Sequence, residues 1–178
     1  MAALAGCDRK KQPQPQPQQA APQIPTATAG GVDRSHKGEQ APAIPFLAPA
    51  GGPATLATFR GKPLLVNLWA TWCAPCVVEL PALQGLAARH ADRLHFVAVA
   101  QDMGGRHEVD PFLASHKAIT VEPYTDKQNV LMTALKADNL PLTIFYDAHG
   151  RERWRVSGRM DWAGPEAEAL ITEGLAAK

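Results

Sequence analysis

The sequence has no excess of charge of either sign, no long apolar run and few cysteines. Lys and Arg number 18 and Asp and Glu number 17, which gives a formal net charge of +1. With that balance and no long basic run, we expect no nucleic-acid partner. No stretch of 18 apolar residues occurs, so no segment is predicted to cross a membrane as a helix. A length of 178 residues, with 46% hydrophobic and 20% charged residues, predicts one globular domain.

The three cysteines divide unevenly along the chain. Cys73 and Cys76 form a C-x-x-C motif, and Cys7 stands alone far upstream. A structural zinc site built on such a motif is the alternative to redox chemistry, and no second C-x-x-C follows. The motif therefore favours thiol redox chemistry, and we expect no metal and no cofactor.

The C-x-x-C lies where a strand pattern meets a helix pattern. Residues 63–68, PLLVNL, predict a central strand buried on both faces, and residues 69–76, WATWCAPC, follow it directly. Two thiols at this spacing at a helix start can close into a disulfide. The free N–H groups of the first turn and the helix dipole favour a thiolate on the first cysteine. We therefore expect Cys73 to attack a partner disulfide and Cys76 to resolve the mixed disulfide.

Strands alternate with helices over the rest of the domain. The pattern predicts a β-hairpin from residues 44–47 and 54–59, a helix over 73–90, strands at 94–100, 118–121, 139–146 and 151–156, and helices at 109–116, 129–135 and from 164. This order predicts an α/β fold with a mixed central sheet flanked by helices on both faces and an N-terminal β-hairpin extension.

The first 42 residues contain a short motif of their own. Residues 4–7, LAGC, resemble the lipobox of bacterial lipoproteins, in which the signal is cut before a cysteine that then receives lipid. Cys7 is the lipid attachment site that this resemblance implies. A complete signal has an apolar region of about 7–15 residues, so we expect the signal to be truncated here. The alternative is a free cysteine in a disordered tail.

A polar, low-complexity segment follows Cys7. The Pro/Gln alternation of residues 12–19 cannot bury enough apolar surface to fold. Periodic structure begins at residue 43, so we assign residues 1–42 to a truncated signal with a disordered tether and residues 43–178 to the folded domain. The basic residues 9–11 favour contact with anionic lipid headgroups. Asp8 directly after the cysteine resembles a signal for retention at the inner membrane.

Three separated motifs carry a family resemblance. They are VNLWATWCAPC at residues 66–76, ELP at residues 79–81, and LPLTIFYDAHG at residues 140–150. On these motifs, residues 43–176 resemble the TlpA/ResA-like branch of the thioredoxin fold. The family's usual Gly-Leu/Val-Pro-Thr-Thr sequence reads Asn-Leu-Pro-Leu-Thr here, at residues 139–143, so Leu142 removes a hydroxyl beside the site.

The resemblance implies a thioredoxin-like fold and a thiol–disulfide oxidoreductase that works outside the cytoplasm. Most family members are reductants, for example of apocytochrome c or of copper-site assembly proteins. The resemblance therefore implies protein thiols and disulfides as substrates and a membrane thiol donor as the reductant. It places the domain in the periplasm, where lipid on Cys7 would hold it to the inner membrane. We expect a monomer.

Four further residues are candidates for the site. Pro141 resembles the family's cis-proline, with Leu140 offering backbone groups to an extended substrate chain; the alternative is a proline that merely opens an edge strand. Glu79, one helical turn after Cys76, resembles a buried carboxylate that moves the proton of the resolving thiol, against the alternative of an exposed helix carboxylate. Trp72 is expected to form a flat apolar contact surface for partners.

Other functions remain open at this point. An oxidase or isomerase uses the same scaffold, because the direction of electron flow depends on a reduction potential that the residues do not define. A Cu(I)-binding module could use both thiolates, although related copper-delivery proteins space their cysteines as C-x-x-x-C. A peroxidase of the peroxiredoxin type is disfavoured, because the tryptophan-flanked C-x-x-C replaces that family's motif.

Overall fold

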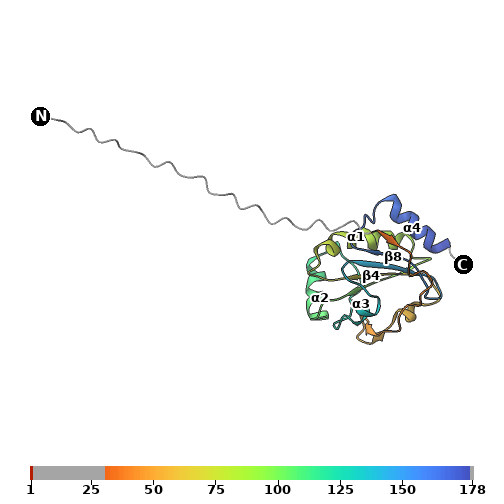
Figure 1. Ribbon diagram of the computed structural model, residues 1–178. Helices are drawn as coiled ribbons and strands as arrows, with labels where there is room; N and C mark the ends of the chain where they lie inside the picture. The colour runs from red at the N-terminus through yellow and green to blue at the C-terminus, as the bar shows by residue number, and fades with distance from the viewer. Residues whose placement is uncertain (2–30, 177–178) are drawn as a thin grey trace.

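A single mixed sheet forms the centre of the computed structural model, which describes Met1 and residues 31–176 (Figure 1). Eight strands lie in the order β1-β8-β7-β4-β5-β6-β2-β3. The strands are β1 (Val32–Asp33), β2 (Phe46–Leu47), β3 (Pro53–Ala54), β4 (Leu64–Trp69), β5 (His95–Ala100), β6 (Tyr124–Thr125), β7 (Leu142–Tyr146) and β8 (Glu152–Ser157). The helices are the 3-10 helix η1 (Leu56–Phe59) and the α-helices α1 (Ala74–Arg89), α2 (Arg106–Ser115), α3 (Val130–Ala134) and α4 (Pro165–Ala176).

Strand β4 lies in the middle of this sheet, as its apolar sequence predicted. It pairs in parallel with β5 and antiparallel with β7, and all six of its residues are buried. Helices cover both faces of the sheet, so β4 carries apolar side chains on both of its faces. The one polar member, Asn67, is satisfied inside the core by donating a hydrogen bond to Thr143 Oγ1 on β7 at 3.0 Å.

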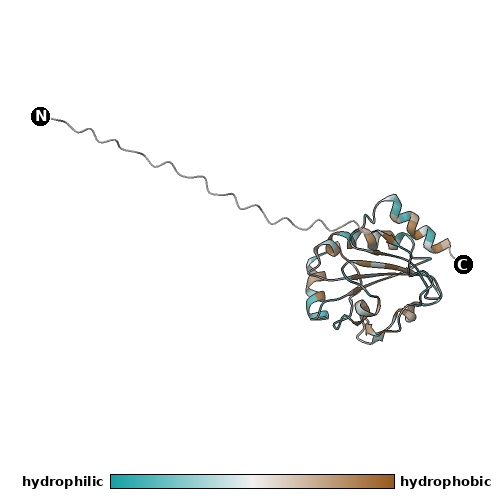
Figure 2. Ribbon diagram, in the orientation of Figure 1, coloured by the Kyte–Doolittle hydropathy of each residue, from teal (hydrophilic) through white to brown (hydrophobic). Residues whose placement is uncertain are grey.

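The helices divide between the two faces of the sheet (Figure 1). Buried residues of α1 and α4 pack on Leu65, Phe145 and Trp154, and α2 joins the same face through Val109. Helix α3, η1 and the β2–β3 hairpin cover the opposite face. In Figure 2 the central strands are mostly at the hydrophobic end of the colour scale, whereas α4 also carries hydrophilic segments. The predicted layered α/β architecture, including the hairpin extension, is therefore confirmed.

Three local predictions were wrong. Residues 56–59 form η1 instead of continuing a strand, and there the N–H of Thr55 is bound by the hydroxyl of Thr58 at 3.1 Å. Helix α2 begins at Arg106 instead of Val109, because the carbonyl of Gly105 accepts the N–H groups of Glu108 and Val109. Residues 118–121, expected as a strand, have no regular secondary structure and begin within a turn in which the Ile119 N–H binds the His116 carbonyl. Strand β6 lies later in the chain.

Residues 31–42 belong to the ordered part of the chain, whereas the composition assigned them to the tether. Strand β1 pairs with β8, and the N–H of Gly38 binds the carbonyl of Glu152 at 2.8 Å. The N–H of Ala41 binds the carbonyl of Gly150 at the same distance, and Ala41 is buried. Backbone hydrogen bonds to the edge of the sheet hold this polar segment in place. Such bonds do not depend on apolar side chains, so the segment is ordered although its sequence has no apolar periodicity.

The described residues contain no helix that is both long enough and apolar enough to span a bilayer. Cys7, with its expected lipid attachment, lies outside the described residues.

Candidate active site

Cys73 and Cys76 meet at the carboxyl end of β4, where the chain turns into α1. Cys73 is the N-cap residue of that helix, and Cys76 lies in its first turn. The two form a disulfide, with their Cα atoms 5.3 Å apart. The turn before the helix is closed by the N–H of Cys73, which binds the carbonyl of Ala70 at 3.1 Å. The predicted redox pair is therefore brought together in its oxidised form.

The start of α1 is an electropositive environment for the Cys73 sulfur. The carbonyl of Cys73 accepts the N–H of Val77, and no side chain of the described residues caps the helix. No acidic residue lies in the first turn to offset the positive end of the helix dipole. Pro75 is accommodated there because its missing N–H would have had no intrahelical acceptor. A thiolate on Cys73 therefore receives backbone stabilisation from this helix.

The two cysteines differ slightly in exposure, and apolar groups surround both. Cys73 is 6% exposed and Cys76 is 1% exposed, so partner molecules reach the first cysteine more easily. Trp72 next to them is 68% exposed, an unusual position for so large an apolar side chain. Trp69 is fully buried in the same cluster. The site therefore offers an enclosed disulfide beside an accessible flat apolar surface.

The segment before β7 contributes Leu140 and Pro141. The peptide bond between them is cis, and Pro141 is buried. Leu140 packs against the apolar cluster that contains both cysteines. Gly158 donates its N–H to the carbonyl of Pro141, whereas the main chain of Leu140 makes no hydrogen bond to another residue in the described range. The Leu140 backbone thus has unused hydrogen-bonding capacity beside the disulfide.

Glu79 is buried one turn after Cys76 on α1. It is 4% exposed, and its Oε2 accepts the N–H of Met160 at 3.2 Å. Burial raises the pKa of this carboxyl from 4.5 to about 7, against smaller lowering effects from the Met160 N–H and the nearby Trp162 side chain. Its other oxygen has no hydrogen-bond partner among the described residues. A carboxyl with this pKa can take up or release a proton near neutral pH.

One feature of the site was not predicted from the sequence. Asp102 is fully buried two residues after β5 and binds Thr71, which lies two residues after β4. The Thr71 N–H is 3.2 Å from each carboxylate oxygen, and the Thr71 hydroxyl donates to Oδ1 at 2.5 Å. Strands β4 and β5 are parallel, so residues that follow their carboxyl ends by the same number of positions lie close together. Thr71 and Asp102 each lie two positions after their strand, and this equal spacing could have predicted the pair from the sequence.

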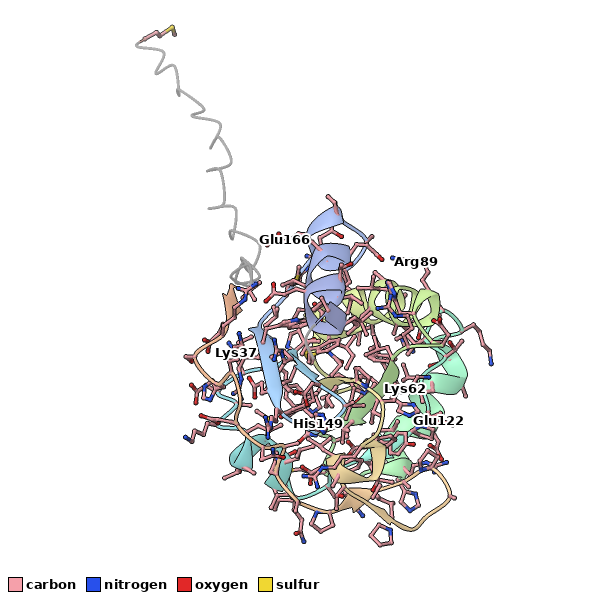
Figure 3. All side chains as sticks on the ribbon, turned by 90° about the vertical axis from the view of Figure 1, so that its right-hand side faces the viewer. Lys37, Lys62, Arg89, Glu122, His149 and Glu166 are labelled. Atoms are coloured by element: carbon pink, nitrogen blue, oxygen red, sulfur yellow. A yellow bond between two sulfur atoms is a disulfide. The ribbon has the colours of Figure 1, made fainter. Side chains whose placement is uncertain are left out.

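Two histidines that follow the motif lie away from the disulfide. His90 caps the far end of α1 and contacts Glu168 of α4 at 2.6 Å, and His95 is exposed at the start of β5. Figure 3 shows the α1 end of this region, where Arg89 is labelled close to α4. Among the described residues, no group of three His, Cys, Asp or Glu side chains comes close enough to hold a metal ion.

The fold and the site define a class of protein, the thioredoxin-like redox domains. A mixed sheet with a C-x-x-C disulfide at the start of a helix and a cis-proline before the antiparallel strand β7 are its features. The sequence pattern of the Redoxin family matches residues 36–171, and the chain belongs to that family. Its relatives place it in the TlpA/ResA-like group that the motifs indicated.

Three comparisons illustrate this relationship. The chain is 35% identical to the thiol:disulfide interchange protein HelX of Rhodobacter capsulatus, over 85% of this chain and 77% of HelX. It is 32% identical to the thiol-disulfide oxidoreductase ResA of Oceanobacillus iheyensis, over 59% of this chain and 54% of ResA. A solved DsbE-type structure from Chlorobium tepidum superposes with a TM-score of 0.68 at 22% identity, covering 78% of this chain and 97% of that one, and confirms the fold.

Some relatives are matched over only part of their length. The aligned segment spans 54% of ResA and 37% of the Bacillus subtilis thioredoxin-like protein YneN, which is less than two thirds of either.

Proposed function

We propose that the protein reduces disulfides of other proteins outside the cytoplasm, with Cys73 as nucleophile and Cys76 as resolving thiol. The observation that carries this proposal is the Cys73–Cys76 disulfide at the start of α1, with Cys73 on the accessible side. The similarity to ResA and HelX, which are named for thiol–disulfide exchange, supports the same activity.

The reaction starts from the reduced pair. The Cys73 thiolate attacks one sulfur of the partner disulfide, the partner's S–S bond breaks, and its second sulfur leaves as a thiolate that takes up a proton. Cys76 then loses its proton and attacks the Cys73 sulfur of the mixed disulfide. The Cys73–Cys76 bond forms, the partner's first sulfur leaves and is protonated, and two electrons have passed to the partner.

Glu79 is the residue that we propose to accept the proton of Cys76. It is buried one helical turn away, where water does not easily serve as the base. Its pKa of about 7 leaves a substantial fraction ionised at neutral pH and ready to take a proton. The same carboxyl can return that proton when the disulfide is reduced again.

The partner's chain is proposed to dock on the surface formed by Trp72 and the segment before β7. Trp72 offers an exposed apolar face, and Leu140 has a main chain without hydrogen bonds to other described residues. An extended substrate segment can pair with the Leu140 N–H and carbonyl, in the manner of strand addition. Pro141 has no N–H of its own to compete for that segment.

The cycle needs a dithiol donor, because each turnover leaves Cys73 and Cys76 oxidised. We propose a membrane thiol protein as that donor and the periplasm as the location, with lipid on Cys7 holding a monomeric domain near the inner membrane. The LAGC motif and the basic residues after it support this arrangement. Labelled fatty acid on Cys7 in the native host is expected, and its absence in a chain with the natural start would contradict the anchor.

Trapping of mixed disulfides tests the activity itself. The Cys76→Ser variant should accumulate protein partners on Cys73 through bonds that dithiothreitol releases. The Cys73→Ser variant, which keeps one thiol but loses the accessible one, is the matched control and should trap far less. Equal trapping by both variants, or by neither, would contradict the assigned roles.

The direction of electron flow needs a separate measurement. Equilibration with glutathione buffers should give a potential near those of reducing thioredoxins. A strongly oxidising potential, such as about −120 mV, would instead make the protein a disulfide oxidase on the same scaffold.

A further inference from the structure

The buried side chain of Asp102, which follows strand β5, binds Thr71, two residues before Cys73. Asp102 is fully buried, and both of its carboxylate oxygens face the N–H of Thr71 at 3.2 Å. The hydroxyl of Thr71 also donates to Oδ1. Thr71 therefore directs both of its hydrogen-bond donors, the main-chain N–H and the hydroxyl, at the carboxyl group of Asp102.

Thr71 lies within the turn that presents the reactive cysteine. The Cys73 N–H binds the carbonyl of Ala70, so Thr71 and Trp72 are the two central residues of that turn. A buried carboxylate that holds the first central residue limits the rotation of the whole turn. Cys73 is the last residue of this turn and the N-cap of α1, so the position of its sulfur depends on the hydrogen bonds between Asp102 and Thr71.

Asp102 is itself held by regular structure on both sides. The preceding residue, Gln101, donates its N–H to the carbonyl of Trp69 at 2.8 Å and extends the β4–β5 pairing. The carbonyl of Asp102 accepts the N–H of Gly105, the N-cap residue of α2, at 2.9 Å. The carboxylate thus connects the redox turn to the end of β5 and the start of α2.

We propose that Asp102 is a positioning residue for Cys73: through Thr71 it holds the turn 70–73 so that the Cys73 sulfur stays at the N-terminus of α1 when the disulfide opens. This inference rests on the proposed function, because it concerns the same sulfur. In the oxidised form the disulfide itself restrains the turn. In the reduced form that restraint is gone, and the Asp102–Thr71 contact is what keeps the thiolate near the helix N–H groups.

The reactivity of Cys73 alone tests this role. In a full chain carrying Cys7→Ser and Cys76→Ser, the rate of iodoacetamide alkylation at neutral pH reports the Cys73 thiolate. Thr71→Val keeps the shape and the N–H but loses the hydroxyl, and we expect alkylation to slow about tenfold, as a displaced reactive group would. Asp102→Ala should slow it at least as much, and Thr71→Ser should restore it to within about twofold of the parent chain.

A second buried aspartate supplies the matched control. Asp126 is buried and accepts the N–H of Leu131 at 2.8 Å, and it makes no contact with the redox turn among the described hydrogen bonds. Asp126→Ala should lower thermal stability while leaving the alkylation rate unchanged. If Asp102→Ala does not fold, Thr71→Val carries the test by itself, because it removes only one hydrogen bond.

Each outcome decides the proposal. Alkylation of the Thr71→Val chain within twofold of the parent rate would overturn it, and so would equal slowing by Asp126→Ala, which would indicate a general loss of stability. Failure of the wild-type chain to exchange with protein disulfides would overturn the proposed function only. A tenfold slowing of alkylation by Thr71→Val would still support the positioning role in that case.

Discussion

The carboxylate of Glu79 on helix α1 accepts the main-chain N–H of Met160, which lies in the loop after β8, at 3.2 Å. This contact connects the redox helix to a segment 81 residues later in the chain. Burial of the carboxyl raises its pKa to about 7, although the Met160 hydrogen bond by itself lowers it. Glu79, which we propose as the proton acceptor for Cys76, therefore also contributes to the stability of the fold.

The free energy of unfolding should depend on pH through Glu79. Its carboxyl has a pKa of about 7 in the folded state and an ordinary value of 4.5 when unfolded, so the folded state binds more protons between these values. Its contribution to stability is full below pH 4.5 and is lost as the pH rises through 7. The loss is on the order of 3 kcal/mol.

The Glu79→Gln variant should lose this part of the pH dependence. Urea unfolding at pH 5 and pH 8.5 measures the difference for each chain. The control is Glu166→Gln, which changes an exposed carboxylate in the first turn of α4 (labelled in Figure 3) and should keep the wild-type profile. A Glu79→Gln profile identical to that of the wild type would contradict a raised pKa.

Trp72 should matter for protein substrates more than for small ones. Its side chain is 68% exposed, so Trp72→Ala should leave thermal stability nearly unchanged. Loss of its apolar contact area should lower kcat/KM for reduction of a protein disulfide about tenfold, since each tenfold corresponds to about 1.4 kcal/mol. Reduction of a small aromatic disulfide should change by less than about threefold.

An exposed apolar residue on α1 controls for the Trp72 effect. Val78 is 61% exposed, so Val78→Ala removes accessible apolar surface beyond the turn that carries Cys73. This variant should retain its rate with protein substrates. An equal loss for both variants would mean that the partner surface is broad and not centred on Trp72.

Two glycines in helices should respond oppositely to alanine. A Cβ at Gly174 in α4 would lie 2.6–2.7 Å from ring atoms of Phe145, which is closer than real Cβ contacts. Gly174→Ala should therefore destabilise the protein by about 1–3 kcal/mol through overpacking.

Gly85 in α1 provides the comparison, because a Cβ there would have, apart from its chain neighbours and the backbone of its own helix, no atom of residues 31–176 within 4 Å. Gly85→Ala should stabilise by up to about 1 kcal/mol, the difference in helix propensity. Denaturant unfolding of the two variants measures both changes. Stabilisation by Gly174→Ala would show that α4 can move away from the sheet without loss.

The buried ion pair of β8 should be costly to break from one side. Arg155 donates two hydrogen bonds to Glu152 at 2.6 Å each and a third to the carbonyl of Leu135 at 2.8 Å. Both side chains are almost completely buried. Arg155→Met leaves the Glu152 carboxylate without its partner, and we expect a loss of about 3–5 kcal/mol in the free energy of unfolding.

The double variant Arg155→Met, Glu152→Leu removes both charges and should recover most of that loss. The exposed pair Arg34–Glu173 is the control, since Arg34→Ala should change stability by less than about 1 kcal/mol. Urea unfolding at pH 7 measures all three chains. A single Arg155→Met variant as stable as the wild type would show that water reaches Glu152.

Strand β4, helix α1 and the cysteine pair at their junction could be predicted from the sequence. These features depend on local patterns, namely an apolar run, a helical period and the spacing of two thiols, and each pattern is complete within about twenty residues. The cis peptide bond before Pro141 followed from the family resemblance of the motif. The sequence alone thus located the cysteine pair at which we propose that redox chemistry takes place.

The tertiary structure decided what surrounds that chemistry. The edge pairing of β1 with β8, the burial of Glu79 under the loop that contains Met160, and the hold of Asp102 on Thr71 all join segments far apart in the chain. No local periodicity or composition in the sequence predicts any of these contacts. They form because sheet pairing places distant polar groups side by side, where each must find a partner once water is excluded.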